Sequence, residues 1–233
     1  MKKIAVFTSG GDAPGMNACL RAVVRTGIYY NMEVVGILQG YEGMIDGKFM
    51  KMTRREVSNI IQKGGTILHS ARSKRFRTKA GRKQAYEQLM KEGIEGVVAI
   101  GGDGTFTGAS IFIKEFDIPI VGCAGTIDND LFGTDFTIGY DTAINTAMNA
   151  IDNIKDTANA HNRLFFVEVM GRDAGFIALN SGIATGAEAV LIPESTTDTE
   201  ILHKILDDNY KNKKLSNIIV VAEGDEEGGA MAV

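Results

Sequence analysis

The sequence predicts an α/β fold with mainly parallel sheets, and two observations carry this prediction. Short apolar runs alternate along the chain with longer segments whose apolar residues recur every three or four positions. The 28 glycines, against 3 prolines, gather in short loops directly after those apolar runs. Strand, glycine loop and helix in repetition is typical of parallel strands that are joined by crossover helices.

The first part of the chain repeats this unit. An apolar run precedes the loop at residues 10–15, and the helix expected from Met16 has one apolar face. A second helix is expected to end at Gly93, and a third follows the loop at residues 101–105. The expected strands are residues 4–8, 34–38, 97–100 and 118–121. The second helix is expected at residues 79–91, and the third is expected to run from the end of the loop at Thr105 through Lys114.

A second series of strands and helices follows a long loop at residues 126–139. Asp141 is a suitable cap for a long helix, and the loop at residues 171–175 precedes another. We therefore expect two Rossmann-like three-layer domains, residues 1–139 and 140–233, with the chain ending inside the second. The strands expected here are residues 164–170, 189–192 and 218–222, and the last helix is expected at residues 199–210.

The overall composition is that of a globular chain with no strong charge. Of the 233 residues, 44% are hydrophobic and 23% charged, and the net charge of −4 argues against non-specific nucleic-acid binding. Cys19 and Cys123 are far apart in the sequence, which disfavours a structural disulfide or a zinc site and favours a reducing cytoplasm. The apolar run at the N-terminus is too short for a signal peptide or a membrane span.

Three glycine loops follow three of the apolar runs. They begin at Gly10, Gly101 and Gly171, and each precedes an expected helix. This geometry binds phosphate, because backbone N–H groups and the helix dipole point at the anion. A single loop of this kind is often only a tight turn, but three together indicate a nucleotide or phosphosugar site. None has the spacing of the P-loop or of the dinucleotide fingerprint.

Several charged residues have both a functional and a structural interpretation. Asp128 and Asp130 follow an apolar run and, in an extended segment, point to the same side, where one could accept a proton from a hydroxyl. Asp103 either meets phosphates through magnesium or caps the following helix. The basic cluster around Arg72 is either a solvated loop or contains a phosphate clamp. Arg21 and Arg25 repel one another at i, i+4 unless an anion lies between them.

Four motifs together resemble those of the bacterial ATP-dependent 6-phosphofructokinases. They are Gly10-Gly11-Asp12-Ala13-Pro14-Gly15-Met16-Asn17, Gly101-Gly102-Asp103-Gly104-Thr105, Gly125-Thr126-Ile127-Asp128-Asn129-Asp130 and Met170-Gly171-Arg172. The resemblance implies a glycolytic, allosterically regulated kinase that transfers the γ-phosphoryl group of MgATP to the 1-hydroxyl of fructose 6-phosphate. It also implies a cytoplasmic homotetramer that binds neither nucleic acid nor membranes.

The resemblance also implies roles for individual residues. Asp128 matches the catalytic base, with Arg172 and Thr126 assisting, and Asp103 matches the Mg²⁺ site. The positions that match the ATP site are Gly11, Tyr41, Arg72, Ser73, Gly102, Asp103, Gly104 and Thr105. Those that match the sugar-phosphate site are Thr126, Ile127, Asp128, Arg163, Met170, Gly171, Arg172 and Glu223, with Arg163 reaching a neighbouring subunit. Those that match a nucleotide or phosphoenolpyruvate effector site are Arg21, Arg25, Arg54, Lys155, Glu188 and Lys214.

Two glycines favour ATP over pyrophosphate as the donor. Pyrophosphate-using relatives carry Asp in place of Gly104 and Lys in place of Gly125, whereas both positions are Gly in this chain. Other positions depart from the family pattern, because Thr105 replaces Ser, Ser73 an aromatic residue and Ala124 Pro. Effector identity is left open by Asn59 and Asn212, which stand where Asp and a basic residue are usual.

Members of this family continue well past residue 233, and the continuation carries further residues that bind the sugar phosphate. A chain of this length is therefore expected to fold poorly or to show no turnover. The alternative function is then a nucleotide-binding fragment or regulatory subunit without turnover.

Overall fold

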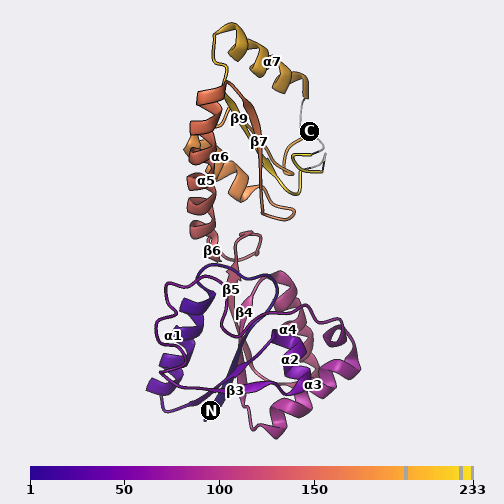
Figure 1. Ribbon diagram of the computed structural model, residues 1–233. Coiled ribbons are helices and arrows are strands. Elements are labelled where there is room, and N and C mark those ends of the chain that lie inside the picture. The colour runs from indigo at the N-terminus through magenta and orange to yellow at the C-terminus, as the bar shows by residue number, and fades with distance from the viewer. Residues whose placement is uncertain (197–198, 226–227, 232–233) are drawn as a thin grey trace. The chain divides into compact units, whose positions relative to one another are not determined.

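The computed structural model describes residues 1–196, 199–225 and 228–231, in two compact units (Figure 1). Unit 1 comprises Met1–Thr126 and Leu131–Gly139, and unit 2 comprises Ile127–Asp130 and Tyr140–Val233. The segment Ile127–Asp130 therefore packs with unit 2 although it follows a strand of unit 1. Val233, the expected end of the second domain, lies outside the described residues.

Unit 1 is built on a six-stranded sheet in the order β3-β2-β1-β4-β5-β6. Its neighbouring strands are parallel except for β2 and β3, which are antiparallel. The parallel arrangement brings the carboxyl ends of β1, β4 and β5 to one edge, and the glycine loops follow these ends. The strands are β1 (Lys3–Thr8), β2 (Glu33–Ile37), β3 (Phe49–Met52), β4 (Gly96–Gly101), β5 (Ile120–Thr126) and β6 (Ile138–Gly139).

Helices cover both faces of this sheet (Figure 1). On one face, the buried side chains Met16, Leu20 and Val24 belong to α1. On the other face, Phe7 of β1 shares an apolar cluster with Leu89 of α3 and Phe112 of α4. This three-layer packing matches the expected architecture. The helices are α1 (Met16–Tyr29), α2 (Gly40–Asp46), α3 (Lys79–Lys91) and α4 (Asp103–Phe116), with a 3₁₀ turn, η1 (Arg75–Arg77).

Unit 2 has a three-stranded parallel sheet in the order β7-β9-β8. Its central strand is buried on both faces, since Ile218 and Val220 pack in the cluster of Ile151, while Ile219 and Val221 pack in the cluster of Leu202. The strands are β7 (Leu164–Val169), β8 (Ala189–Leu191) and β9 (Asn217–Ala222). The helices are α5 (Tyr140–His161), α6 (Phe176–Thr185) and α7 (Thr199–Lys211).

The predicted α/β class with mainly parallel sheets is confirmed, but four short elements were not expected. They are α2, β3, η1 and β6, the last of which lies inside the predicted loop at residues 126–139. Helix α5 begins at Tyr140, so Asp141 lies in its first turn and the expected cap is wrong. No helix in the described part of the chain is long and apolar enough to cross a membrane.

Candidate functional site

Glycine loops meet at the carboxyl edge of the sheet in unit 1. Thr105 is buried, and its hydroxyl donates to the Ser9 carbonyl at 3.2 Å, which joins the loop after β4 to the loop after β1. A Cβ at Gly101 would lie 2.5 Å from the Thr105 Oγ1 and 2.6 Å from the Ser9 oxygen, so only glycine permits this approach. The structure thus brings Gly102–Thr105 beside the loop that contains Gly11.

The N-terminus of α4 lies in this group of loops and is open to a ligand. Its N-cap, Gly102, provides no side-chain hydrogen bond, and a Cβ at Gly104 or Gly11 would meet no atom within 4 Å. Asp103 is the first residue of the helix, so the capping role considered for it is wrong. Exposed N–H groups at a helix N-terminus attract anions such as phosphate.

Thr126 ends β5 beside this helix N-terminus. A Cβ at Gly102 would lie 3.5 Å from the Thr126 Cβ, and the Thr126 carbonyl accepts a hydrogen bond of 2.7 Å from the Thr137 hydroxyl. Thr126 therefore belongs to the group of loops in unit 1, whereas Ile127 and Asp128 belong to unit 2.

Tyr41 supports these loops from inside the core. Its side chain is only 6% exposed, stacks on Phe76 with ring centroids 3.8 Å apart, and donates its hydroxyl to the Thr105 carbonyl at 2.6 Å. Burial raises the pKa of Tyr41 above its usual range. The predicted ATP-site residue Tyr41 thus holds Thr105 in place, and its ring is shielded from solvent.

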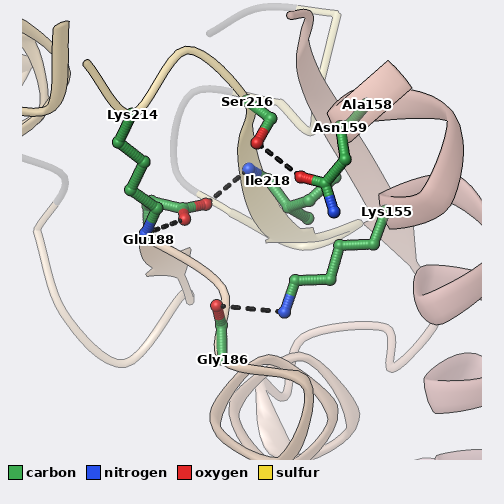
Figure 2. A pocket seen from close by; sticks show the side chains of 8 residues that line it. All are labelled: Lys155, Ala158, Asn159, Gly186, Glu188, Lys214, Ser216 and Ile218. Carbon is green, nitrogen blue, oxygen red and sulfur yellow. Dashed lines mark hydrogen bonds and ion pairs between the residues drawn. The ribbon is translucent and has the colours of Figure 1, made fainter. Parts of the chain in front are cut away.

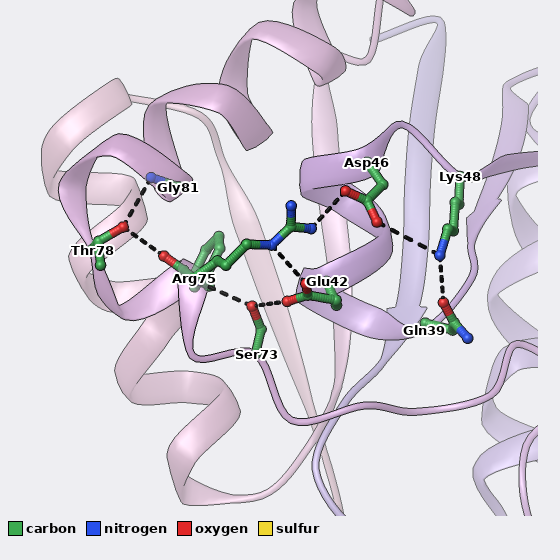
Figure 3. Close-up of polar contacts among 9 residues, drawn as sticks. Gln39, Glu42, Asp46, Lys48, Ser73, Arg75, Thr78 and Gly81 are labelled. Carbon is green, nitrogen blue, oxygen red and sulfur yellow. Dashed lines mark hydrogen bonds and ion pairs between the residues drawn. The ribbon is translucent and has the colours of Figure 1, made fainter.

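The basic cluster at residues 72–79 divides into residues with different partners. Arg75 forms ion pairs with Glu42 at 2.6 Å and with Asp46 at 2.5 Å (Figure 3). Ser73 donates its hydroxyl to the same Glu42. Arg72 is exposed and makes no hydrogen bond or ion pair with the residues that the structure describes. Arg72 is therefore available to a phosphate group, whereas Arg75 anchors the segment to α2.

Glu42 and Asp46 were not expected in this site, because their helix, α2, was not predicted from the sequence. This helix is only seven residues long and contains two glycines, Gly40 and Gly43. The sequence does contain a signal, because a glycine such as Gly47 often follows the end of a helix, and the two acids are spaced i, i+4 as on one helix face. In the structure Gly47 adopts the expected left-handed conformation.

Asp128 and Arg172 come together in unit 2. The Asp128 carboxylate is almost buried, and its Oδ2 lies 3.4 Å from the Arg172 Nε. The Arg172 side chain remains 55% exposed, so one end of this pair is open to solvent. A carboxylate that is paired with a guanidinium can take a proton while the guanidinium turns to another anion.

The segment that carries Arg172 is held by Glu223. One carboxylate oxygen, Oε1, accepts the backbone N–H of Gly171 at 3.1 Å and that of Arg172 at 2.6 Å. Arg172 has a φ of 53°, and a Cβ at Gly171 would lie 2.4 Å from the Ala174 oxygen. These unusual backbone conformations are of the kind that gather at functional sites. The parallel pairing of β7 and β9 places both ends side by side.

Two other predicted sugar-site residues lie around β7. Met170 follows the carboxyl end of β7, directly before Gly171, and is 61% exposed. Arg163 precedes β7 and is therefore at the opposite end of the strand from Arg172. The structure does not bring Arg163 and Arg172 together within one chain.

A second candidate site is a cavity of about 150 Å³ in unit 2 (Figure 2). Lys214 pairs with Glu188 at 2.5 Å, and the Lys155 ammonium donates to the Thr185 carbonyl. The three unit 2 residues of the predicted effector set, Lys155, Glu188 and Lys214, thus line one cavity.

The remaining effector residues belong to unit 1. Arg21 donates to the Val57 carbonyl at 2.5 Å, while Arg25 and Arg54 are exposed. The Val57 carbonyl thus accepts a hydrogen bond from one member of the Arg21–Arg25 pair.

The donor set fits magnesium through a single carboxylate. Asp103 is exposed and makes no hydrogen bond or ion pair within the described residues. No group of three or more His, Cys, Asp or Glu side chains that could hold a metal occurs there either. Mg²⁺ is commonly bound by one or two carboxylates together with phosphate oxygens and water, which agrees with one acid beside an anion-binding helix terminus.

Known proteins resemble this chain over its whole length. It is 60% identical over 233 residues to the "ATP-dependent 6-phosphofructokinase" of Cytophaga hutchinsonii, covering all of this chain and 71% of that protein. It is 57% identical over 230 residues to the "ATP-dependent 6-phosphofructokinase 1" of Thermus thermophilus, covering 99% of this chain and 71% of that protein. The predicted resemblance is therefore confirmed, and the chain spans about 71% of the length of these relatives.

Solved structures agree with this relationship. The phosphofructokinase of Saccharomyces cerevisiae matches with a TM-score of 0.93 and 41% identity over 97% of this chain and 34% of that chain. A pyrophosphate-dependent phosphofructokinase from Marinobacter aquaeolei, with a TM-score of 0.84 and 23% identity over all of this chain and 64% of that chain, shares the fold. The family described as phosphofructokinase matches residues 3–232. The chain belongs to the phosphofructokinase family.

Proposed function

We propose that this protein transfers the γ-phosphoryl group of ATP to the 1-hydroxyl of fructose 6-phosphate. The observation that carries this proposal is the ion pair between the nearly buried Asp128 and the exposed Arg172. Relatives that are 52–60% identical are named ATP-dependent 6-phosphofructokinases, in agreement with this activity.

On the acceptor side, Asp128 receives the proton of the sugar hydroxyl while the oxygen of that hydroxyl attacks the γ-phosphorus. The bond from that phosphorus to the bridging oxygen breaks, and ADP leaves. Arg172 turns from Asp128 to the transferred group, where a guanidinium compensates the charge on the equatorial oxygens. Glu223 keeps Arg172 in position through the two backbone N–H groups. Ile127, Met170 and Gly171 are the proposed neighbouring sugar contacts.

On the donor side, the phosphates lie at the N-terminus of α4, against Gly11 and Gly102–Thr105. The exposed Arg72 binds them with its planar fork, Ser73 lies beside it, and Thr126 closes the group. Asp103 is the residue that would hold Mg²⁺, and the ion would supply positive charge to the phosphate oxygens.

The two discriminating glycines support ATP as the donor. The open space at Gly104 leaves room for the α-phosphate, and an Asp there would repel it. A Cβ at Gly125 would already lie 3.0 Å from Ile100 and 3.5 Å from Met16, so a Lys side chain would be crowded.

The regulatory part of the proposal rests on the cavity of Lys155, Glu188 and Lys214. Two lysines and a carboxylate suit an anionic effector with donor groups, such as a nucleoside diphosphate or phosphoenolpyruvate. Arg21, Arg25 and Arg54 complete this site from another subunit of a homotetramer, and Arg163 likewise serves a neighbouring sugar site. The proposed location is the cytoplasm.

The test is a coupled assay for fructose 1,6-bisphosphate with protein of verified intact mass. Product that requires ATP, fructose 6-phosphate and Mg²⁺ together supports the proposal. Calorimetric binding of ATP with no product under any of these conditions would instead favour the nucleotide-binding alternative.

A further inference from the structure

The two cysteines of this chain lie in neighbouring elements of unit 1. Cys19 is on α1 and Cys123 is on β5, and both are free and partly buried. The sequence separation of these residues led us to expect no structural disulfide. Their positions in the fold nevertheless raise the question of whether the two thiols meet.

The contact between Met16 and Gly125 shows which side of β5 faces α1. A Cβ at Gly125 would lie 3.5 Å from the Met16 Cε. Cys123 is two residues from Gly125 on the strand and thus points to the same face. On the opposite face, a Cβ at Gly122 would lie 2.7 Å from Phe106 of α4. The Cys123 side chain therefore points toward α1.

The chain directions bring Cys19 to the same place. Strands β1, β2, β4 and β5 all run in one direction, so α1, which connects β1 to β2, runs in the other. A step from Met16 to Cys19 stays on one helix face and moves about 4.5 Å toward the amino end of β5. A step from Gly125 to Cys123 moves about 6.6 Å the same way. Both steps start at the approach of Met16 to Gly125 and lead in the same direction, so they bring Cys19 close to Cys123.

The electrostatics of the two thiols agree with this contact. A hydrogen bond with Cys123 raises the pKa of Cys19, and burial adds to this rise. The hydrogen bond from Cys19 lowers the pKa of Cys123 to about 7, against the opposing effect of burial. Cys123 is thus the sulfur that ionises first, and a thiolate is the reactive form of cysteine.

We propose that Cys19 and Cys123 form a peroxide-sensitive dithiol that closes reversibly to an intramolecular disulfide between α1 and β5. The Cys123 thiolate attacks an oxygen of a hydroperoxide. An S–O bond forms, the O–O bond breaks, and the other oxygen leaves with a proton as water or an alcohol. The Cys19 sulfur then attacks the sulfenic sulfur, and the hydroxide leaves with the Cys19 proton as water. The thiols lose two electrons, and the peroxide gains them.

The experiment treats the protein with hydrogen peroxide, blocks the remaining thiols and digests it with trypsin without reduction. Cleavage after lysine and arginine places Cys19 in peptide 4–21 and Cys123 in peptide 115–155. We expect the two peptides to be joined, with a mass two hydrogen atoms below their sum, and to be separated again by dithiothreitol. The undigested protein should run as a single chain on a non-reducing gel. Independent oxidation of each thiol to sulfinic acid, or linkage only between chains, would overturn the proposal.

Two serine variants serve as matched controls. Cys19→Ser should stop at a Cys123 sulfenic acid that dimedone traps, because no second thiol is left to close the disulfide. Cys123→Ser should yield no joined peptides within one chain, because the attacking thiolate is gone. Phenylarsine oxide, which bridges two adjacent thiols, should bind the wild type and neither variant. Failure of the arsenical to bind folded wild-type protein would show that the thiols are too far apart.

Discussion

The Arg172 Nε lies 3.4 Å from the Oδ2 of Asp128, although 44 residues separate them in the sequence (172 minus 128). Asp128 is nearly buried and Arg172 is half exposed, so the pair has one shielded and one accessible end. This asymmetry suits a base that stays in place and a cation that moves to an anionic substrate. It also separates the effects expected from changing each partner.

Asp128→Asn should retain the fold and the affinity for both substrates but lose the proton acceptor. Removal of a positioned base costs roughly 10²–10⁴-fold in kcat. Steady-state kinetics of fructose 1,6-bisphosphate formation measure this effect. The matched control is Asp117→Asn, because Asp117 is exposed and has a φ of 52°, a conformation that Asn tolerates. Near-normal turnover of Asp128→Asn would refute its role as the base.

Arg172→Lys should reduce kcat more than it weakens sugar binding. The ammonium keeps the charge but lacks the planar fork that contacts two oxygens at once, and a lost transition-state donor costs roughly 10²-fold. The measurement is kcat and KM for fructose 6-phosphate, with circular dichroism to verify the fold. An increase in KM alone would assign Arg172 to ground-state binding.

Gly104→Asp should fold normally and lose affinity for ATP. A Cβ at this position meets no atom within 4 Å, and an acid in the first turn of α4 interacts favourably with the helix dipole. The carboxylate would nevertheless repel the α-phosphate, and we expect the KM for ATP to rise about 10-fold or more. Gly104→Ala is the control for bulk without charge. Equal effects of the two substitutions would rule out the electrostatic explanation.

The Arg82–Glu115 pair should make unfolding sensitive to acid. Arg82 Nε lies 2.6 Å from Glu115 Oε2, and its Nη2 lies 2.7 Å from Oε1. The hydrogen bonds from Arg82 lower the pKa of Glu115 below its usual value of 4.5. A lowered folded-state pKa adds stability above the unfolded-state pKa, and this stability is lost as the pH falls from about 4.5 through the lowered value.

Urea unfolding between acidic and neutral pH measures this contribution. Glu115→Gln should lower the midpoint at neutral pH and flatten its fall below about pH 4.5. The control is Glu87→Gln, whose partner Lys83 is 3.9 Å away, with both side chains largely exposed. Parallel pH profiles for wild type and Glu115→Gln would contradict this assignment.

Local sequence patterns predicted most of the regular elements. The helix expected at residues 79–91 has the observed bounds of α3, and the apolar runs ending at Thr8 and Ile100 became the strands β1 and β4. The short elements α2, β3 and β6 were missed. They are short, since β3 has four residues and β6 two, while α2 has seven residues of which two are glycines. Pairing with neighbouring strands stabilises β3 and β6, so their own sequences carry little signal.

The sequence by itself determined the α/β alternation, the glycine loops and the family, because apolar periodicity and turn residues are local properties of the chain. Only the tertiary structure decided that Arg75 binds Glu42 while Arg72 stays exposed, and that Tyr41 supports Thr105 from the core. It also decided the strand order β7-β9-β8, which places Glu223 beside Gly171. The physical reason is that strand order and ion pairing are settled by contacts between residues that are distant in the chain, where no local pattern records the partner.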